Sequence, residues 1–201
     1  MKPVFNIKHV TLNIHTYQRA PALVALGAAF AAAAATPAQS PVEKADIEIP
    51  AHGEYWPGEG GSNGGFVPAR GDVPAHYLIV GANDIGDYKH GGHGHDTGAT
   101  SKTDGAANTR ALIDSGIDHP AAKACTEYSA DGHADYHLPA SSELYQCWLN
   151  CPELFDKEPW YATSTQFSAY GSCVMDFSDG DQSNALKHYE RRVRPVRRKF
   201  I

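Results

Sequence analysis

The sequence predicts a loop-rich domain of mixed α+β class, in which two to three helices pack on small antiparallel sheets. Apolar residues make up 42% of the 201 residues, which is enough for a buried core. The 19 glycines and 13 prolines favour many turns. Within residues 46–201, helical patterns are confined to residues 104–150, whereas strand patterns fill most of the chain that follows. Helices and strands segregated in this way are typical of the α+β class.

The charge of the chain argues against a general nucleic-acid binder, because the net charge is -6 and such a protein needs a basic face. The exception is the segment RRVRPVRRK at residues 191–199. It could bind DNA or an anionic glycan. We favour a structural interpretation, in which Val193 and Val196 are buried in a closing strand and the arginines pair with acidic neighbours.

Residues 1–45 differ in composition from the rest and are expected to form an N-terminal arm. Residues 10–15 alternate apolar and polar side chains, as a strand does, and residues 20–35 form an Ala-rich run that favours a helix. The run is short for a membrane span. The segment is either an arm for attachment or oligomerisation or a signal peptide. Lysines and an arginine precede the run, and small residues follow it at 36–38.

Local patterns place the elements of residues 46–201. Residues 53–65 are Gly-rich and are expected to form turns, and residues 76–80 are expected to form a strand. Helices are expected over residues 104–115, from Pro120 to before Gly132, and after Ser141 as the N-cap. Further strands are expected over residues 136–138, 160–165, 172–177, 182–187 and 192–197, with a hairpin turn at Asp179-Gly180.

The four cysteines are too few for a disulfide scaffold in a chain of this length. Cys147 and Cys151 share one face of an expected helix, where a bridge rarely forms. Cys125 and Cys173 are free to pair, and four reduced, buried thiols are the alternative.

Residues 46–201 also contain an ordered series of short motifs. The series consists of GEYWPG at 53–58, GG at 60–61, HYLI at 76–79, DGAANT at 104–109, HPAA at 119–122, DYHLP at 135–139, EL at 143–144, WYATST at 160–165, DFSDG at 176–180 and RVRPVRR at 192–198. In this order the motifs resemble the Lcl-type C-terminal domain, found in bacterial collagen-like adhesins and in phage tail-fibre proteins. Tyr136 and His137 stand where that family more often has an aromatic pair containing Trp.

The resemblance implies a C-type-lectin-like fold for residues 46–201 and a binding function rather than an enzymatic one. The opening WPG segment looks most like the phage versions. The implied protein is a tail-fibre or tail-tip receptor-binding subunit of a virion, attached to other tail proteins through residues 1–45. A homo-oligomer is expected, with a trimer as one form, and the partner is a host glycan, lipopolysaccharide or protein receptor. The alternatives are a secreted or cell-surface bacterial adhesin, and a structural decoration or joint of the virion.

The expected ligand-binding face combines aromatic rings with short hydrogen-bonding groups, a mixture used by adaptable recognition surfaces. In lectin-like phage receptor binders this stretch of chain is often the ligand face, so the resemblance implies the same role here. The residues are Tyr161, Thr163, Gln166, Ser168, Tyr170, Asp181, Gln182, Asn184, His188 and Tyr189.

A histidine-rich loop is a candidate site for a divalent metal. His90, His93, His95 and Asp96 lie in the segment KHGGHGHD, whose glycines let the chain fold around an ion. The alternative is a polar loop with exposed histidines, because no fixed ligand spacing is met. No catalytic residues are predicted and no other cofactor is expected, since no Gly-x-Ser-x-Gly motif is present.

Overall fold

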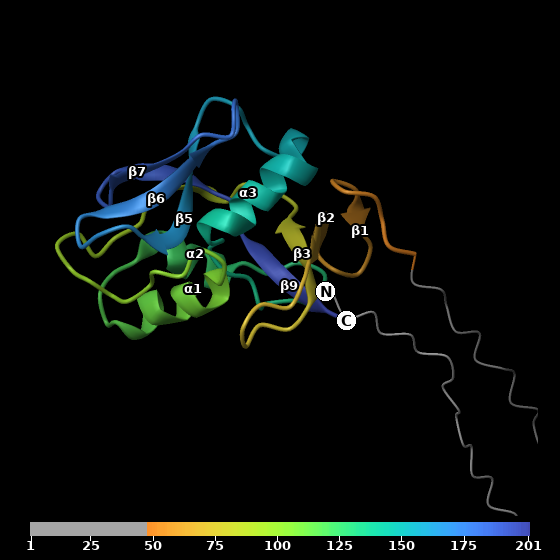
Figure 1. Ribbon diagram of the computed structural model, residues 1–201, viewed down its shortest axis with the longest axis horizontal. Coiled ribbons are helices and arrows are strands. Elements are labelled where there is room, and N and C mark those ends of the chain that lie inside the picture. The colour runs from red at the N-terminus through yellow and green to blue at the C-terminus, as the bar shows by residue number, and fades with distance from the viewer. Residues whose placement is uncertain (1–47) are drawn as a thin grey trace, which may run out of the picture. The chain divides into compact units, whose positions relative to one another are not determined.

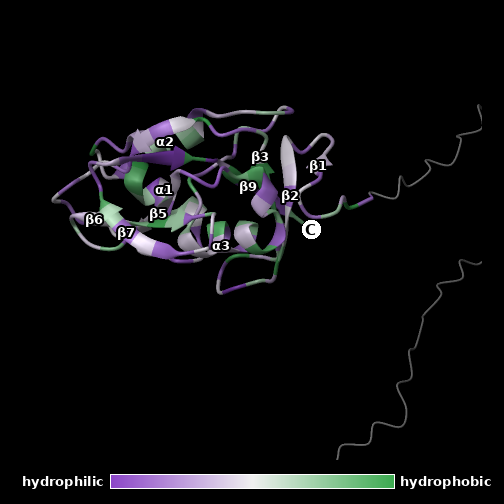
Figure 2. Ribbon diagram, turned by 90° about the horizontal axis from the view of Figure 1, so that it is seen from above, coloured by the Kyte–Doolittle hydropathy of each residue, from purple (hydrophilic) through white to green (hydrophobic). Residues whose placement is uncertain are grey.

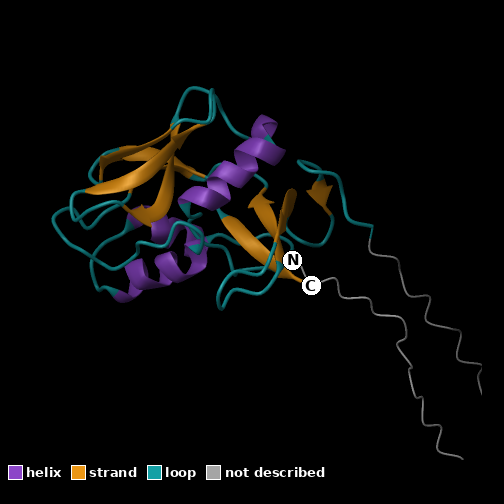
Figure 3. Ribbon diagram, in the orientation of Figure 1, coloured by secondary structure: helices purple, strands orange, loops and turns teal. Residues whose placement is uncertain are grey.

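The computed structural model describes residues 48–201, and the predicted N-terminal arm lies outside them. The described residues form three helices, a short 3-10 turn and nine strands, so the predicted α+β class is confirmed (Figures 1 and 3). The helices are α1 (Gly105–Asp114), α2 (Pro120–Glu127) and α3 (Ser141–Asn150), and the 3-10 turn spans Pro152–Leu154. None of the helices in this part of the chain is long and apolar enough to cross a membrane.

The strands form two sheets whose neighbours are antiparallel, apart from the parallel pair β5 and β8. The first sheet has the order β1-β2-β3-β9 and contains β1 (Tyr55–Trp56), β2 (Gly61–Val67), β3 (His76–Gly81) and β9 (Val196–Phe200). The second has the order β4-β8-β5-β6-β7 and contains β4 (Gly86–Lys89), β5 (Trp160–Gln166), β6 (Gly171–Asp176), β7 (Gln182–Leu186) and β8 (Glu190–Val193).

Local signals explain where the helices begin. The helix predicted over residues 104–115 begins as expected: Asp104 is the N-cap of α1, and its carboxylate accepts a hydrogen bond from Ala107 N–H at 2.9 Å. Pro120 occupies the first turn of α2. The predicted cap Ser141 is wrong by one residue, because Ala140 is the N-cap of α3. The Glu143 carboxylate accepts the Ala140 N–H at 2.8 Å, while Ser141 N–H donates to Thr165 Oγ1.

One prediction of turns and two predictions of strands need correction. Residues 53–65 are not turns throughout, because β1 and the start of β2 form an antiparallel pair there. Residues 136–138 form only an isolated bridge between His137 and Val196. The closing segment is not one strand over 192–197: β8 ends at Val193 and β9 begins at Val196, in different sheets. Pro195 lies at the break, where its missing N–H interrupts strand pairing. Strand β4 was not predicted.

The largest core cluster lies where α3 packs on both sheets (Figure 2). It includes Leu78, Leu144, Tyr161 and Phe177, all fully buried. A second cluster joins α2 to the opposite face of β5 through Cys125, Leu138, Ala162 and Val193. Successive β5 residues therefore point into different clusters, so this strand is covered on both faces.

The cysteines and the closing arginines complete the packing. All four thiols are free, so the alternative of reduced cysteines describes this structure, although Cys173 is only half-buried. Val193 and Val196 are fully buried, as predicted. Arg192, Arg194, Arg197 and Arg198 each form an ion pair with a carboxylate. The basic segment is thus largely neutralised within the fold.

Candidate functional site

Three loops meet at the end of the five-stranded sheet. They are the loop that follows β4 (residues 90–104), the β5–β6 loop (167–170) and the β7–β8 loop (187–189). Backbone hydrogen bonds cross-link them: Gly94 N–H donates to Ala169 O at 2.9 Å, Lys187 N–H donates to Tyr170 O at 2.9 Å, and Gly91 N–H donates to Lys187 O at 3.1 Å. Side chains on these loops are therefore held in a fixed relation.

Four rings from these loops form a continuous exposed cluster, the histidine–tyrosine face, made of His93, Tyr170, His188 and Tyr189. The His93 ring centroid lies 5.2 Å from that of Tyr170 and 5.0 Å from that of His188, and His188 lies 4.5 Å from Tyr189. Tyr170 and Tyr189 are 58% and 50% exposed. Large aromatic rings with this much exposure, gathered in one place, are unusual on a surface without a binding role.

A concavity of about 350 Å³ adjoins this face, lined by His93, His95, Lys187 and His188 together with Ile117 and Asp118 before α2. Its polar lining contains imidazole, ammonium and carboxylate groups. The combination of a concave surface with a few convergent polar groups and flanking rings is the common form of a small-ligand site.

The buried Lys187 side chain holds the histidine-rich loop in place through hydrogen bonds. Its ammonium donates to His95 O at 2.8 Å and to Gln166 Oε1 at 2.9 Å. Gln166 in turn accepts from Thr97 Oγ1 at 2.9 Å and donates from Nε2 to Asp96 Oδ1 at 2.5 Å. Burial lowers the pKa of Lys187, and the charge of Asp96 partly opposes that shift. This network orders the loop that carries His93.

The predicted metal set of His90, His93 and His95 is not brought together. His90 is buried against His119, with ring centroids 5.6 Å apart, and His119 Nδ1 lies 2.9 Å from His90 O. Burial lowers the pKa of His90 to about 4, and the nearby His119 and Lys187 add to the shift. His93 and His95 are exposed. Within residues 48–201, no three His, Cys, Asp or Glu side chains converge as a metal site would require.

The ten predicted ligand-binding residues divide into three groups. Tyr161, Thr163 and Gln166 are buried, so their placement on a ligand-binding surface is wrong. Tyr161 Oη donates to Asp84 Oδ2 at 2.8 Å, and Thr163 Oγ1 donates to Cys173 O at 2.8 Å, so both hydroxyls are occupied inside the fold. The cause is the position of β5, which lies between β8 and β6 with helices on both faces.

The second group, Tyr170, His188 and Tyr189, forms most of the histidine–tyrosine face.

The third group lies along β7 and the turns beside it. Gln182 and Asn184 line a smaller groove of about 240 Å³ with Phe167. Asp181 is exposed, and the exposed Ser168 accepts Gly171 N–H at 3.0 Å in the β5–β6 turn. Phe167 is 65% exposed and was missed, although an aromatic residue in an expected loop is a usable signal.

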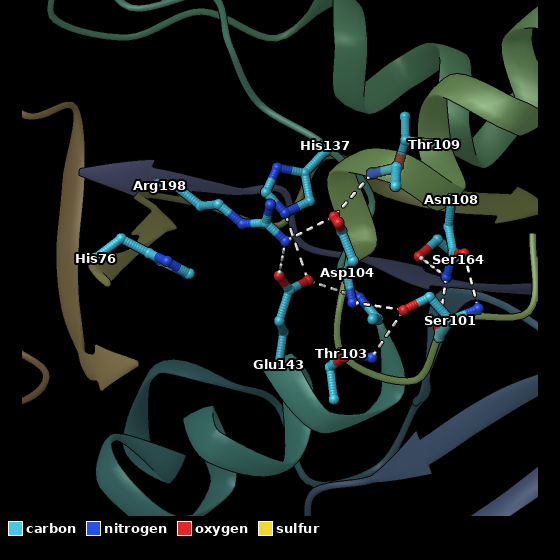
Figure 4. Close-up of polar contacts among 12 residues, drawn as sticks. His76, Ser101, Thr103, Asp104, Asn108, Thr109, His137, Glu143, Ser164 and Arg198 are labelled. Atoms are coloured by element: carbon cyan, nitrogen blue, oxygen red, sulfur yellow. Dashed lines mark hydrogen bonds and ion pairs between the residues drawn. The ribbon is translucent and has the colours of Figure 1, made fainter. Parts of the chain in front are cut away.

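A second polar cluster lies largely inside the domain, with Glu143, His137 and Arg198 buried and Asp104 partly exposed (Figure 4). Arg198 of β9 donates to Asp104 Oδ1 at 2.8 Å and to Glu143 Oε1 at 3.0 Å. His137 Nε2 lies 3.4 Å from Glu143 Oε2. Burial alone would raise the pKa of Glu143, but attraction to His137 and Arg198 and the Ala140 N–H bond outweigh it and lower the pKa to about 2. The cluster ties α1, α3 and β9 together.

Comparison with known proteins adds no assignment, because no family model matches the chain and no similar curated protein is found. The structure itself shows an α+β domain that carries the exposed histidine–tyrosine face.

The glycines of the histidine-rich loop provide a test of how tightly it is held. Gly91 and Gly98 both have positive φ, +81° and +72°. A Cβ at Gly91 would overlap Asp118 O and lie 2.8 Å from His119 Cα, whereas one at Gly98 would meet nothing. We expect Gly91→Ala to lower the free energy of unfolding by about 2–4 kcal/mol, and Gly98→Ala by only about 1 kcal/mol, in urea titrations. Equal losses would contradict this account of the loop.

Proposed function

We propose that this protein is a receptor-binding adhesin whose ligand contacts the histidine–tyrosine face. The observation that carries the proposal is the cluster of exposed rings on three cross-linked loops. Two tyrosines offer flat apolar area at low conformational cost, and the imidazoles beside them supply hydrogen bonds. Because the loops are already ordered, binding does not have to pay for ordering them.

The narrower form of the proposal is a member of the Lcl-type family with a C-type-lectin-like fold, acting in a phage tail fibre or tail tip. What supports it is the resemblance of the ordered motifs, which also supply residues that organise the fold. Asp104 of DGAANT caps α1, Pro120 of HPAA begins α2, and Arg198 of the closing motif links α1 to α3. Copies of the chain in one fibre would strengthen weak single contacts through multivalency.

A binding experiment tests the proposal. Fluorescently labelled protein is added to a panel of bacterial cells and to immobilised lipopolysaccharide and glycans, and bound fluorescence is measured. On the surfaces that bind the wild type, we expect the double variant Tyr170→Ala/Tyr189→Ala to bind at least about tenfold more weakly, since exposed aromatic anchors often dominate binding energy.

The matched control is Tyr145→Ala/Leu149→Ala, which removes two exposed apolar side chains from α3. We expect it to bind like the wild type. If the tyrosine variant also binds like the wild type, the face is not the receptor site and a structural role as a virion decoration or joint gains support. Because Tyr161 and Gln166 are buried, their substitution would test folding rather than adhesion.

The cellular context needs a separate measurement. N-terminal sequencing of the native protein distinguishes the two settings, since a chain that begins near Gln39 indicates export to the bacterial surface. A chain that retains residues 1–38 in purified virions supports the tail-fibre assignment.

A further inference from the structure

Two exposed imidazoles on different loops lie next to each other at the mouth of the concavity. His93 belongs to the histidine-rich loop and His188 to the β7–β8 loop, and both line the same hollow. Their ring centroids are 5.0 Å apart, and the ring planes are inclined by 62°. The sequence separates these residues widely, so the pair is a product of the fold.

The distance of 5.0 Å between the two ring centroids suits a shared metal ion. A zinc–imidazole bond measures about 2.0–2.1 Å, which places each ring centroid roughly 3.2 Å from the ion. Two such rings at a tetrahedral angle have centroids about 5 Å apart. The observed centroid separation of 5.0 Å is therefore compatible with both rings binding one ion.

The surroundings hold the two rings in place. The Tyr170 ring packs edge-on against His93, and the Tyr189 ring packs against His188. Gly94 N–H and Gly91 N–H, on either side of His93, are bonded to the other two loops. Pre-positioned ligands on a supported backbone reduce the cost of assembling a metal site.

We infer that His93 and His188 form a two-histidine site for a divalent cation of the zinc or nickel class, completed by water. Imidazole nitrogens are preferred ligands for these ions. Of the set His90, His93 and His95 expected from the sequence, only His93 belongs to this site, and His188 joins it from another loop.

The neighbouring charges set how strongly the ion is held. Lys89 and Lys187 line the concavity and oppose a cation, whereas Asp118 favours it. With two protein ligands and this charge balance, we expect a readily exchanged ion rather than a permanent one.

The test uses the full chain without an affinity tag and the metal alone. Calorimetric titration with Ni²⁺ or Zn²⁺ should show one ion bound per chain for the wild type. We expect His93→Ala and His188→Ala each to weaken binding at least about tenfold, and the double variant to abolish it. The control His52→Ala removes an exposed histidine outside the concavity and should leave binding unchanged.

Circular dichroism of each variant checks that the fold is kept, which we expect because both side chains are exposed. The inference is overturned if the wild type binds no ion at millimolar metal, or if the folded double variant binds as the wild type does. The readout is metal affinity, so it is independent of whether the face also binds a receptor.

Discussion

Replacing Glu143 by glutamine is expected to lower the free energy of unfolding by about 3–5 kcal/mol, although the two side chains have nearly the same shape. Glu143 is 4% exposed and accepts hydrogen bonds from Arg198 and from Ala140 N–H. The amide keeps the volume but removes the charge that balances Arg198. Breaking one partner of a buried ion pair leaves the other charge uncompensated, which is costlier than losing an exposed pair.

The matched control is Glu127→Gln. Glu127 lies 3.9 Å from Lys123 in an exposed pair on α2, so the loss should stay below about 1 kcal/mol. Urea or thermal unfolding of both variants measures the difference. A loss for Glu143→Gln as small as that of the control would mean that the buried cluster does not stabilise the fold.

The same carboxylate gives a pH dependence whose sign follows from its lowered pKa. The pKa of Glu143 is about 2 in the folded protein, against an ordinary value of 4.5. The folded state therefore binds fewer protons than the unfolded state between these values. Its stabilising contribution is complete above about pH 4.5 and is lost as the pH falls toward 2. The stability difference between wild type and Glu143→Gln should shrink over this window.

Elements with strong local signals were predictable from the sequence. The cap Asp104, the stop at Gly116, the first-turn Pro120 and the Asp179-Gly180 turn each act within a few residues, and α1, α2 and the β6–β7 hairpin follow. Strand β4 has no such signal. It forms because its backbone pairs with β8, far along the chain.

The candidate site likewise contains residues whose exposure could be predicted from the sequence and residues whose burial could not. The exposure of Tyr170, His188 and Tyr189 was predictable, because they follow the ends of expected strands, and connecting loops lie at the surface. The segment that contains Tyr161, Thr163 and Gln166 reads as a half-exposed strand, yet the fold covers both of its faces. Likewise, the spacing of His90 and His93 does not reveal that His119 of a later segment packs over only the first of them.

Arg194 lies beside Pro195 at the break between β8 and β9, and removing its buried side chain should have a comparably large effect. Arg194 is 7% exposed and lies where the chain passes from one sheet to the other. Its guanidinium donates to Gly81 O at 2.9 Å, Ala82 O at 2.8 Å and Leu154 O at 2.6 Å. It also pairs with Asp84 at 3.3 Å.

We therefore expect Arg194→Met to lower the free energy of unfolding by about 3–5 kcal/mol, because the buried Gly81 carbonyl, two part-buried carbonyls and Asp84 all lose the same donor. Arg194→Lys should recover only part of this loss, since one ammonium cannot donate to carbonyls on several sides as a planar guanidinium does. Arg70→Met, at an exposed arginine, is the control and should change stability by less than about 0.5 kcal/mol. If Arg194→Met unfolds in urea at the same midpoint as Arg70→Met, the Arg194 hydrogen bonds do not stabilise the junction of the two sheets.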